Sequence, residues 1–245
     1  MNEKAHFIDR VSREMAEDFG GETLAPREAL AAACRILARE GHESGLAGQV
    51  TARAERRDAW WTLQFGYGFD EATAERMVLV DEDLKPIQGG RPNPGTRFHI
   101  WVYRKRPDVN AIIHTHAPYA SALAATGQPL KTIHMDSAML HGSAHLAEWP
   151  GVPVADDEGR IISAALGEAK AILLANHGLL ATGASVEEAC YLAVFFERAA
   201  RMQLRAMAAG GFKEVRPALA EEACRFLLQP SIVGATFRYW ARVSA

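Results

Sequence analysis

The stretch Asn110–Ala117 constrains this chain most, because it joins a buried-strand pattern to two histidines. Its apolar, β-branched first half predicts a buried strand. Alternate side chains of a strand share a face, so His114 and His116 point the same way, roughly 7 Å apart along the backbone. A second apolar run, Lys170–Gly178, carries His177 close to its end. Three histidines with no cysteine beside them favour a catalytic metal ion with open coordination positions.

A purely structural interpretation competes with this one. Histidines at strand ends often bond to backbone carbonyls, and a His-x-His pair alone does not separate the two interpretations. The equivalent context of His177 strengthens the metal hypothesis.

Chain length and composition narrow the class of protein. With 245 residues, 49% of them hydrophobic and 23% charged, the chain can bury one large core, and we expect a single domain over residues 1–245. The formal net charge of −3 provides no electrostatic reason to expect a nucleic acid or an anionic membrane as partner. A small molecule is therefore the expected partner.

The N-terminal stretch Met1–Arg10 lacks the apolar core of a signal peptide. No apolar run approaches the roughly 20 residues that a membrane-spanning helix needs, so we expect a cytoplasmic protein. The cysteines Cys34, Cys190 and Cys224 are odd in number, far apart and set in helical patterns. They predict reduced, buried thiols rather than a disulfide or zinc–thiolate framework.

Hydrophobic periodicity predicts the elements around this centre. Short strand-like runs at 48–53, 59–65 and 76–80 would form an antiparallel part of a sheet, and a further strand is expected over 132–136. A capping box, Ser185–Glu188, opens the strongest helical pattern. The helices are expected over 7–19, 26–40, 96–105, 119–125, 158–166, 185–209 and from 218 onward.

Six motifs can be quoted from the chain: Gly48–Arg53, Phe69–Glu71, Met77–Asp81, Arg97–His99, Arg106–His116 and Leu174–Leu179. Together they resemble the class II aldolase/adducin family over nearly the whole chain. The resemblance implies an α/β fold, a three-layer α/β/α domain with a largely antiparallel central sheet, and a homotetramer with active sites at subunit interfaces. It assigns His114, His116 and His177 as ligands of a divalent ion, usually zinc and in some members manganese.

Three positions depart from the pattern of the sugar-phosphate aldolases in that family. Pro92–Thr96 stands where those enzymes carry Pro-Ser-Ser-Glu, with Gly95 at the position of the acid/base glutamate. Gly48–Thr51 replaces a Gly-Asn-Ile-Ser turn that contacts phosphate, and Met135 corresponds to a tyrosine from the neighbouring subunit. These changes argue against phosphate binding and against ordinary aldolase acid/base chemistry.

Three neutral imidazoles leave the full charge on a bound metal ion, which can stabilise a developing enolate. Decarboxylation reaches such an intermediate without a base, so we favour a metal-dependent carbon–carbon lyase that decarboxylates a small hydroxy- or keto-carboxylate, aromatic ones included. His134 is the first candidate for the proton donor. Arg91, beside the start of a helix at Gly95, is a candidate for binding the carboxylate, or else a plain surface charge.

Two alternatives stay open. An aldolase acting on an unphosphorylated hydroxy-carbonyl substrate would need another carboxylate as its base, such as Asp136 or Glu71. A non-catalytic, adducin-like interaction domain is a different class. The intact histidine set argues against it, because a scaffold has no chemical need of three converging imidazoles.

Overall fold

The computed structural model describes residues 3–21, 24–42 and 44–244. The first two residues of the N-terminal stretch Met1–Arg10 therefore lie outside the described residues. The strands are β1 (Gln49–Arg53), β2 (Trp60–Leu63), β3 (Met77–Val80), β4 (Pro86–Gln88), β5 (Ala111–Thr115), β6 (Ala144–Leu146), β7 (Ala171–Leu174) and β8 (Gly178–Gly183). The α-helices are α1 (Glu3–Phe19), α2 (Pro26–Arg39), α3 (Arg97–Lys105), α4 (Pro118–Ala125), α5 (Asp156–Leu166), α6 (Val186–Ala208), α7 (Pro217–Leu227) and α8 (Pro230–Val243).

Within the described residues, the eight strands form one sheet, in the order β4-β3-β2-β1-β5-β8-β7-β6. Every neighbouring pair is antiparallel except β6 and β7, which are parallel. The expected α/β fold with a largely antiparallel central sheet is therefore confirmed. Strand β5, which carries the two histidines, lies in the middle of the sheet between β1 and β8.

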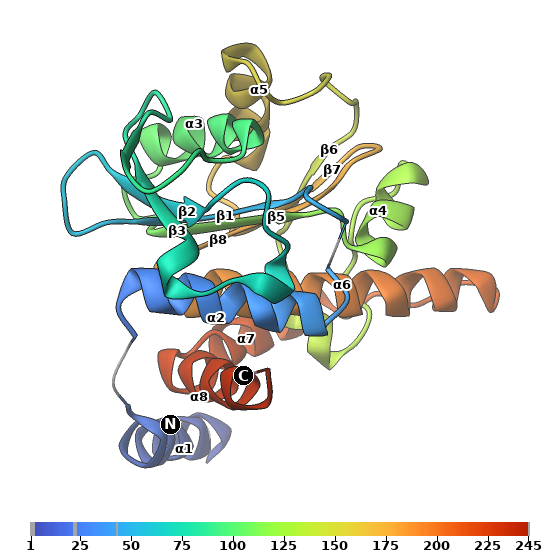
Figure 1. Cartoon of the computed structure of the whole chain (residues 1–245). Coiled ribbons are helices and arrows are strands. Elements are labelled where there is room, and N and C mark those ends of the chain that lie inside the picture. The colour runs from blue at the N-terminus through green and yellow to red at the C-terminus, as the bar shows by residue number, and fades with distance from the viewer. Residues whose placement is uncertain (1–2, 22–23, 43, 245) are drawn as a thin grey trace.

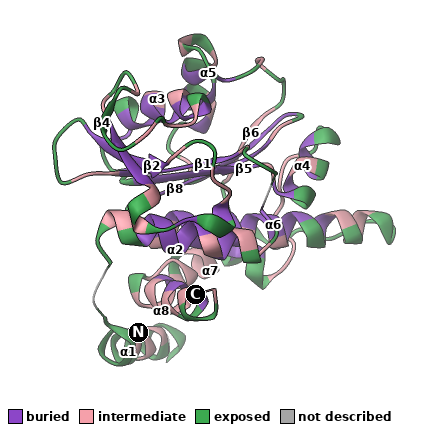
Figure 2. Ribbon diagram, viewed as in Figure 1, coloured by how far each residue is buried: buried purple, intermediate pink, exposed green. Residues whose placement is uncertain are grey.

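Helices cover both faces of the sheet and give the three layers (Figure 1). Helices α3 and α5 lie on one face, α2 and α6 on the other, and α7, α8 and α1 lie beyond α2 and α6. Successive side chains of β5 point to opposite faces of the sheet. Ile112 packs in the hydrophobic cluster that contains Phe98 and Ile162. Ile113 packs in the cluster that contains Leu30 and Phe196. Figure 2 shows the sheet as a buried layer and α1 as largely exposed.

The capping residues of α6 act much as the sequence predicts. Ser185 Oγ accepts a hydrogen bond from the Glu188 backbone N–H at 3.2 Å, so it caps the helix. The Glu188 carboxylate bonds the N–H of Ala184 at 2.7 Å instead of that of Ser185, so the reciprocal half of the predicted box is shifted by one residue.

Two predictions of secondary structure were wrong. The expected strand over 132–136 is irregular chain that runs into a 3₁₀ helix, η4 (Met135–Leu140). Ser137 explains this, because its Oγ bonds the N–H of Ile133 at 3.1 Å and the carbonyl of His134 at 2.8 Å, which holds a local turn. Gly178, expected to end an apolar run, instead begins β8, which pairs with both β5 and β7.

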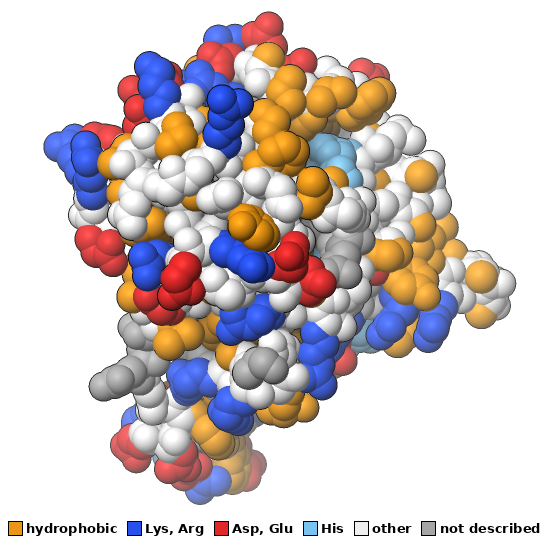
Figure 3. All heavy atoms as spheres, in the orientation of Figure 1, with side chains coloured by type: hydrophobic (Ala, Val, Ile, Leu, Met, Phe, Trp, Pro, Cys, Tyr) orange, Lys and Arg blue, Asp and Glu red, His pale blue; other side chains and the backbone are white. Residues whose placement is uncertain are grey.

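The described cysteines are free, and Cys34 and Cys190 are buried as predicted, whereas Cys224 is only partly buried. None of the described helices has both the length and the apolar character that crossing a bilayer requires. In Figure 3 the visible face mixes Lys and Arg with Asp and Glu, and histidine atoms reach the surface beside hydrophobic side chains.

Candidate metal centre

The C-terminal end of β5 and the residues that follow it bring His114 and His116 to the same end of the buried sheet. All five residues of β5 are buried, and His114 is 1% exposed. His116 lies just past the strand, before Pro118 begins α4, and is partly exposed. The two side chains share a face as their spacing predicts, and Thr115 turns away to bond His42 at 2.9 Å.

His177 reaches the same place from the tight turn between β7 and β8. Asn176, at φ 52°, adopts the left-handed conformation that asparagine tolerates better than most residues. The turn is fixed on both sides: the His177 N–H donates to the Leu174 carbonyl at 3.1 Å, and Ser121 Oγ of α4 donates to the His177 carbonyl at 2.9 Å. The imidazole therefore comes from a rigid turn and not from the end of a strand.

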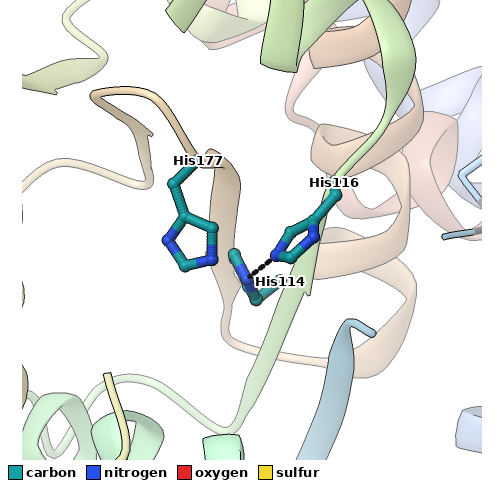
Figure 4. A group of neighbouring side chains, drawn as sticks. All are labelled: His114, His116 and His177. Atoms are coloured by element: carbon teal, nitrogen blue, oxygen red, sulfur yellow. Dashed lines mark hydrogen bonds between the residues drawn. The ribbon is translucent and has the colours of Figure 1, made fainter. Parts of the chain in front are cut away.

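The three imidazoles converge on one point (Figure 4). Their ring centroids are 4.6–5.0 Å apart, and one nitrogen from each ring lies within 4.8 Å of the other two. The Nε2 atoms of His114 and His116 are 3.1 Å apart. Ligands at about 2.0–2.1 Å from a tetrahedral zinc ion would be about 3.3 Å apart. The donor set thus fits one divalent ion with at least one coordination position open to a ligand.

Backbone contacts set the orientation of His114. Its Nδ1 is 2.7 Å from the Leu179 carbonyl oxygen, which can only accept, so Nδ1 carries the proton. In the neutral ring this leaves the Nε2 lone pair directed toward the other two histidines. The edge of Phe98 packs against the ring, with centroids 5.1 Å apart. The hydrogen bond from His114 to the Leu179 carbonyl therefore orients this ring as a metal ligand. The same bond is compatible with the purely structural interpretation, but it does not argue against a metal.

The environment keeps all three imidazoles neutral, which is the form that binds a cation. Burial is the main cause that lowers each pKa. For His114 the pKa falls well below its ordinary value, with the nearby His177 and His116 adding to the effect. The pKa of His116 is also lowered, and that of His177 falls to about 4. At neutral pH a metal ion would therefore displace no protons from this group.

The predicted catalytic residues lie apart from the histidine cluster within one chain. His134 lines a pocket between α1, η4 and α7, and its Nδ1 accepts from the Asp136 N–H at 3.2 Å. Its Nε2 is enclosed and has no hydrogen-bond partner among the described residues. Arg91 is exposed. Among the described residues, neither His134 nor Arg91 belongs to the group of side chains that could hold a metal ion.

The carboxylates considered as replacement bases are also elsewhere. Glu71 caps a 3₁₀ turn, where its Oε2 accepts from the Gly68 N–H at 3.0 Å. Asp136 is exposed in the first turn of η4. Among the described residues, the group that could hold a metal contains histidines alone. Gly95 leaves room for a different neighbour: a Cβ there would lie 2.8 Å from the Nε2 of Gln49.

Some residues that shape the site carry no obvious sequence signal. Glu197 of α6 accepts from the N–H groups of Tyr119 and Ala120 at 2.8 and 2.7 Å, which fixes the start of α4 directly after His116. Burial raises the pKa of this carboxyl. In the sequence, Glu197 is indistinguishable from the exposed charged residues of an amphipathic helix. Its role in fixing the start of α4 follows only from its burial and its hydrogen bonds in the structure.

Comparisons with known proteins agree with this geometry. The sequence matches the family model described as the Class II Aldolase and Adducin N-terminal domain over residues 28–204. It is 31% identical over 200 residues to L-fuculose phosphate aldolase from Escherichia coli O6:H1, covering 80% of this chain and 89% of that protein. It is 33% identical over 191 residues to Decarboxylase NovR from Streptomyces niveus, covering 76% and 71%.

The fold matches a solved structure of L-fuculose 1-phosphate aldolase from Glaciozyma antarctica PI12 with a TM-score of 0.82 at 28% identity, over 96% of this chain and 95% of that one. Relatives that are aldolases and decarboxylases share lyase chemistry, for which a histidine-bound divalent ion is suited. This chain is a metal-dependent lyase and belongs to the class II aldolase and adducin family.

Proposed function

We propose that the enzyme decarboxylates a small hydroxy- or keto-carboxylate, aromatic ones included. The observation that carries this proposal is the combination of an intact histidine triad with Gly95 at the position where the resemblance implies a glutamate base. Decarboxylation needs charge stabilisation but no base for its first step. Similarity to Decarboxylase NovR supports the same assignment.

His114, His116 and His177 would hold the divalent ion, zinc by preference and manganese as the alternative. When bound, the ion supplies positive charge that stabilises the negative charge developing on a substrate oxygen as the carbon–carbon bond breaks. The chain itself fixes the ligands before binding: the Leu179 carbonyl orients His114, and Ser121 holds the turn of His177. Such preorganisation avoids reorganisation during the reaction.

The carbon that loses carbon dioxide must then receive a proton, and His134 is our proposed donor. Its Nε2 has no hydrogen-bond partner among the described residues, so contact with a ligand would break no existing bond. Because His134 lies apart from the triad of its own chain, this role requires the triad of a second copy. The proposal therefore includes a homo-oligomer, a tetramer by family resemblance, in which Arg91 binds the substrate carboxylate.

An aldolase acting on an unphosphorylated hydroxy-carbonyl substrate is the second candidate. Similarity to L-fuculose phosphate aldolase favours it. It would require a base, and neither Glu71 nor Asp136 belongs to the described group around the triad. The two candidates differ in their products: a decarboxylase releases carbon dioxide, whereas an aldolase releases an aldehyde.

The test is a screen of hydroxy- and keto-carboxylates with zinc- or manganese-loaded enzyme, scored separately for carbon dioxide and aldehyde. His116→Ala serves as the matched control, because it removes one ligand from a partly exposed position and leaves the buried strand intact. We expect stoichiometric carbon dioxide from the wild type, and sharply lower metal content and no turnover in the variant. Aldehyde without carbon dioxide would assign the protein to the aldolases. Wild-type protein that binds no divalent ion at micromolar concentration would refute the proposal.

A further inference from the structure

Helix α4 connects two of the three histidines of the triad. His116 lies two residues before Pro118, the first residue of α4. From within the helix, Ser121 Oγ donates a hydrogen bond to the carbonyl oxygen of His177 at 2.9 Å. The position of this one helix therefore sets where His116 and His177 lie relative to each other.

The sequence of α4 does little to fix the helix by itself. It has eight residues, and isolated helices shorter than about 12–15 residues are marginal in water. Its N-cap is Ala117, whose methyl side chain cannot accept a hydrogen bond, and Pro118 has no N–H group. The N–H groups of Tyr119 and Ala120 are thus left without an acceptor inside the helix. An acceptor must come from elsewhere in the chain.

Glu197 of α6 is that acceptor. Its Oε1 accepts from the Tyr119 N–H at 2.8 Å and its Oε2 from the Ala120 N–H at 2.7 Å, so each carboxylate oxygen holds one N–H group. Glu197 is 7% exposed, and α6 packs against α4 (Figure 1). A carboxylate at a helix N-terminus also interacts favourably with the helix dipole. Because α6 is a 23-residue helix packed against β5 and β8, it holds α4 against the strands that lead to the triad.

We propose that Glu197 is a positioning residue of the metal centre, which holds α4 and thereby sets the distance between His116 and His177. The inference rests on the histidine ligand set of the proposed function and applies to either candidate lyase reaction. It assigns an effect on metal affinity to a side chain that acts through backbone N–H groups of α4. A carboxylate that served only to stabilise the fold would lower the thermal midpoint when replaced and leave metal affinity unchanged.

The test measures the zinc affinity of Glu197→Gln by competition with a chromogenic chelator, at a temperature where the variant is folded. The amide keeps the size of the side chain, but it has one acceptor oxygen where the carboxylate has two. Groups that orient metal ligands typically change metal affinity by about 10- to 100-fold when they are replaced, and we expect a loss in that range. In metal-free protein, the amide protons of Tyr119 and Ala120 should exchange faster than in the wild type, which reports the loosened helix independently of any metal.

Glu188→Gln is the matched control on the same helix. The side chain of Glu188 is 12% exposed, and its carboxylate also accepts a backbone N–H, that of Ala184, at 2.7 Å. Ala184 directly follows β8, at the end of the strand away from His177. This variant should lose stability and keep both wild-type zinc affinity and wild-type amide exchange in α4.

Ser121→Ala tests the other contact between α4 and the triad. It removes the hydrogen bond to the His177 carbonyl from a partly exposed position, so it should fold even if Glu197→Gln does not. We expect weaker zinc binding here too. In the double variant, the loss should be smaller than the product of the two single losses, because both act through one helix.

The outcomes separate this inference from the proposed function. Wild-type zinc affinity in a folded Glu197→Gln variant, or in Ser121→Ala where Glu197→Gln does not fold, overturns the inference and leaves the decarboxylase proposal standing. An equal loss of zinc affinity in Glu188→Gln would reflect a general loss of stability and would also overturn it. A full product of losses in the double variant refutes the shared route through α4. Wild-type protein that binds no zinc refutes the proposed function, and this inference fails with it.

Discussion

Gly178→Ala is the substitution that should damage the metal centre without removing a ligand. Gly178 begins β8 immediately after His177. A Cβ there would overlap the carbonyl oxygen of Thr115 and lie 3.2 Å from the Cα of His116. Both are backbone atoms, so no side-chain rotation relieves the contact. Either the end of β5, which carries His114, or the start of β8, which directly follows His177, must move.

The size of the effect follows from this geometry. Overpacking of this kind costs about 1–3 kcal/mol of folding stability. For a chain of this length, each kcal/mol lowers the thermal midpoint by about 2–4 °C. Residues that orient metal ligands typically affect metal affinity by about 10- to 100-fold when they are replaced. We expect a loss in this range for Gly178→Ala, because one of three ligands is displaced.

The assay is zinc affinity, measured by competition with a chromogenic chelator, alongside a thermal melt. Gly183→Ala is the control at the opposite end of β8, where a Cβ would lie 2.5 Å from the Ala189 nitrogen and 2.6 Å from the Ser185 carbonyl oxygen. It should lose similar stability and keep its zinc affinity. Zinc affinity unchanged in a folded Gly178→Ala variant would refute the argument that this glycine sets the spacing of the triad.

Three further outcomes are expected. His134→Gln should retain its metal and lose activity on the hydroxy-carboxylate by about 10²–10⁴-fold, the usual contribution of a general acid; full activity would remove His134 from the mechanism. Sugar phosphates should bind no more tightly than their unphosphorylated parents, because Pro92–Thr96 and Gly48–Thr51 lack the serines and the asparagine that the resemblance implies for phosphate binding, and calorimetry with a ketose 1-phosphate checks this. Burial holds the pKa of His42 at about 3, so the folded chain keeps this histidine neutral while the unfolded chain protonates it below pH 6.5. The free energy of unfolding is therefore unaffected by this histidine above pH 6.5, and it falls by about 1.4 kcal/mol per pH unit below that pH. Urea unfolding of metal-free protein between pH 7 and 5 should show a smaller loss of stability in His42→Asn than in the wild type.

The sequence by itself determined the features that depend on near neighbours. The two-residue period of a strand places His114 and His116 on one face, whatever the strand packs against. The cap at Ser185 and the prolines at the starts of α2 and α4 likewise act through bonds within a few residues. These local signals sufficed for most helices and for two of the three metal ligands as a pair.

Only the tertiary structure decided how distant segments complete the centre. His177 joins the pair because β8 lies beside β5, and Leu179, 65 residues from His114, fixes that ring through its backbone carbonyl. β8 itself was not predicted, since Gly178–Gly183 has no alternation and is stabilised by pairing on both sides. The neighbourhood of Gln49 and Gly95 also arises from the packing of a loop on β1. Such contacts depend on the register between strands, which the burial of whole faces sets and no local pattern specifies.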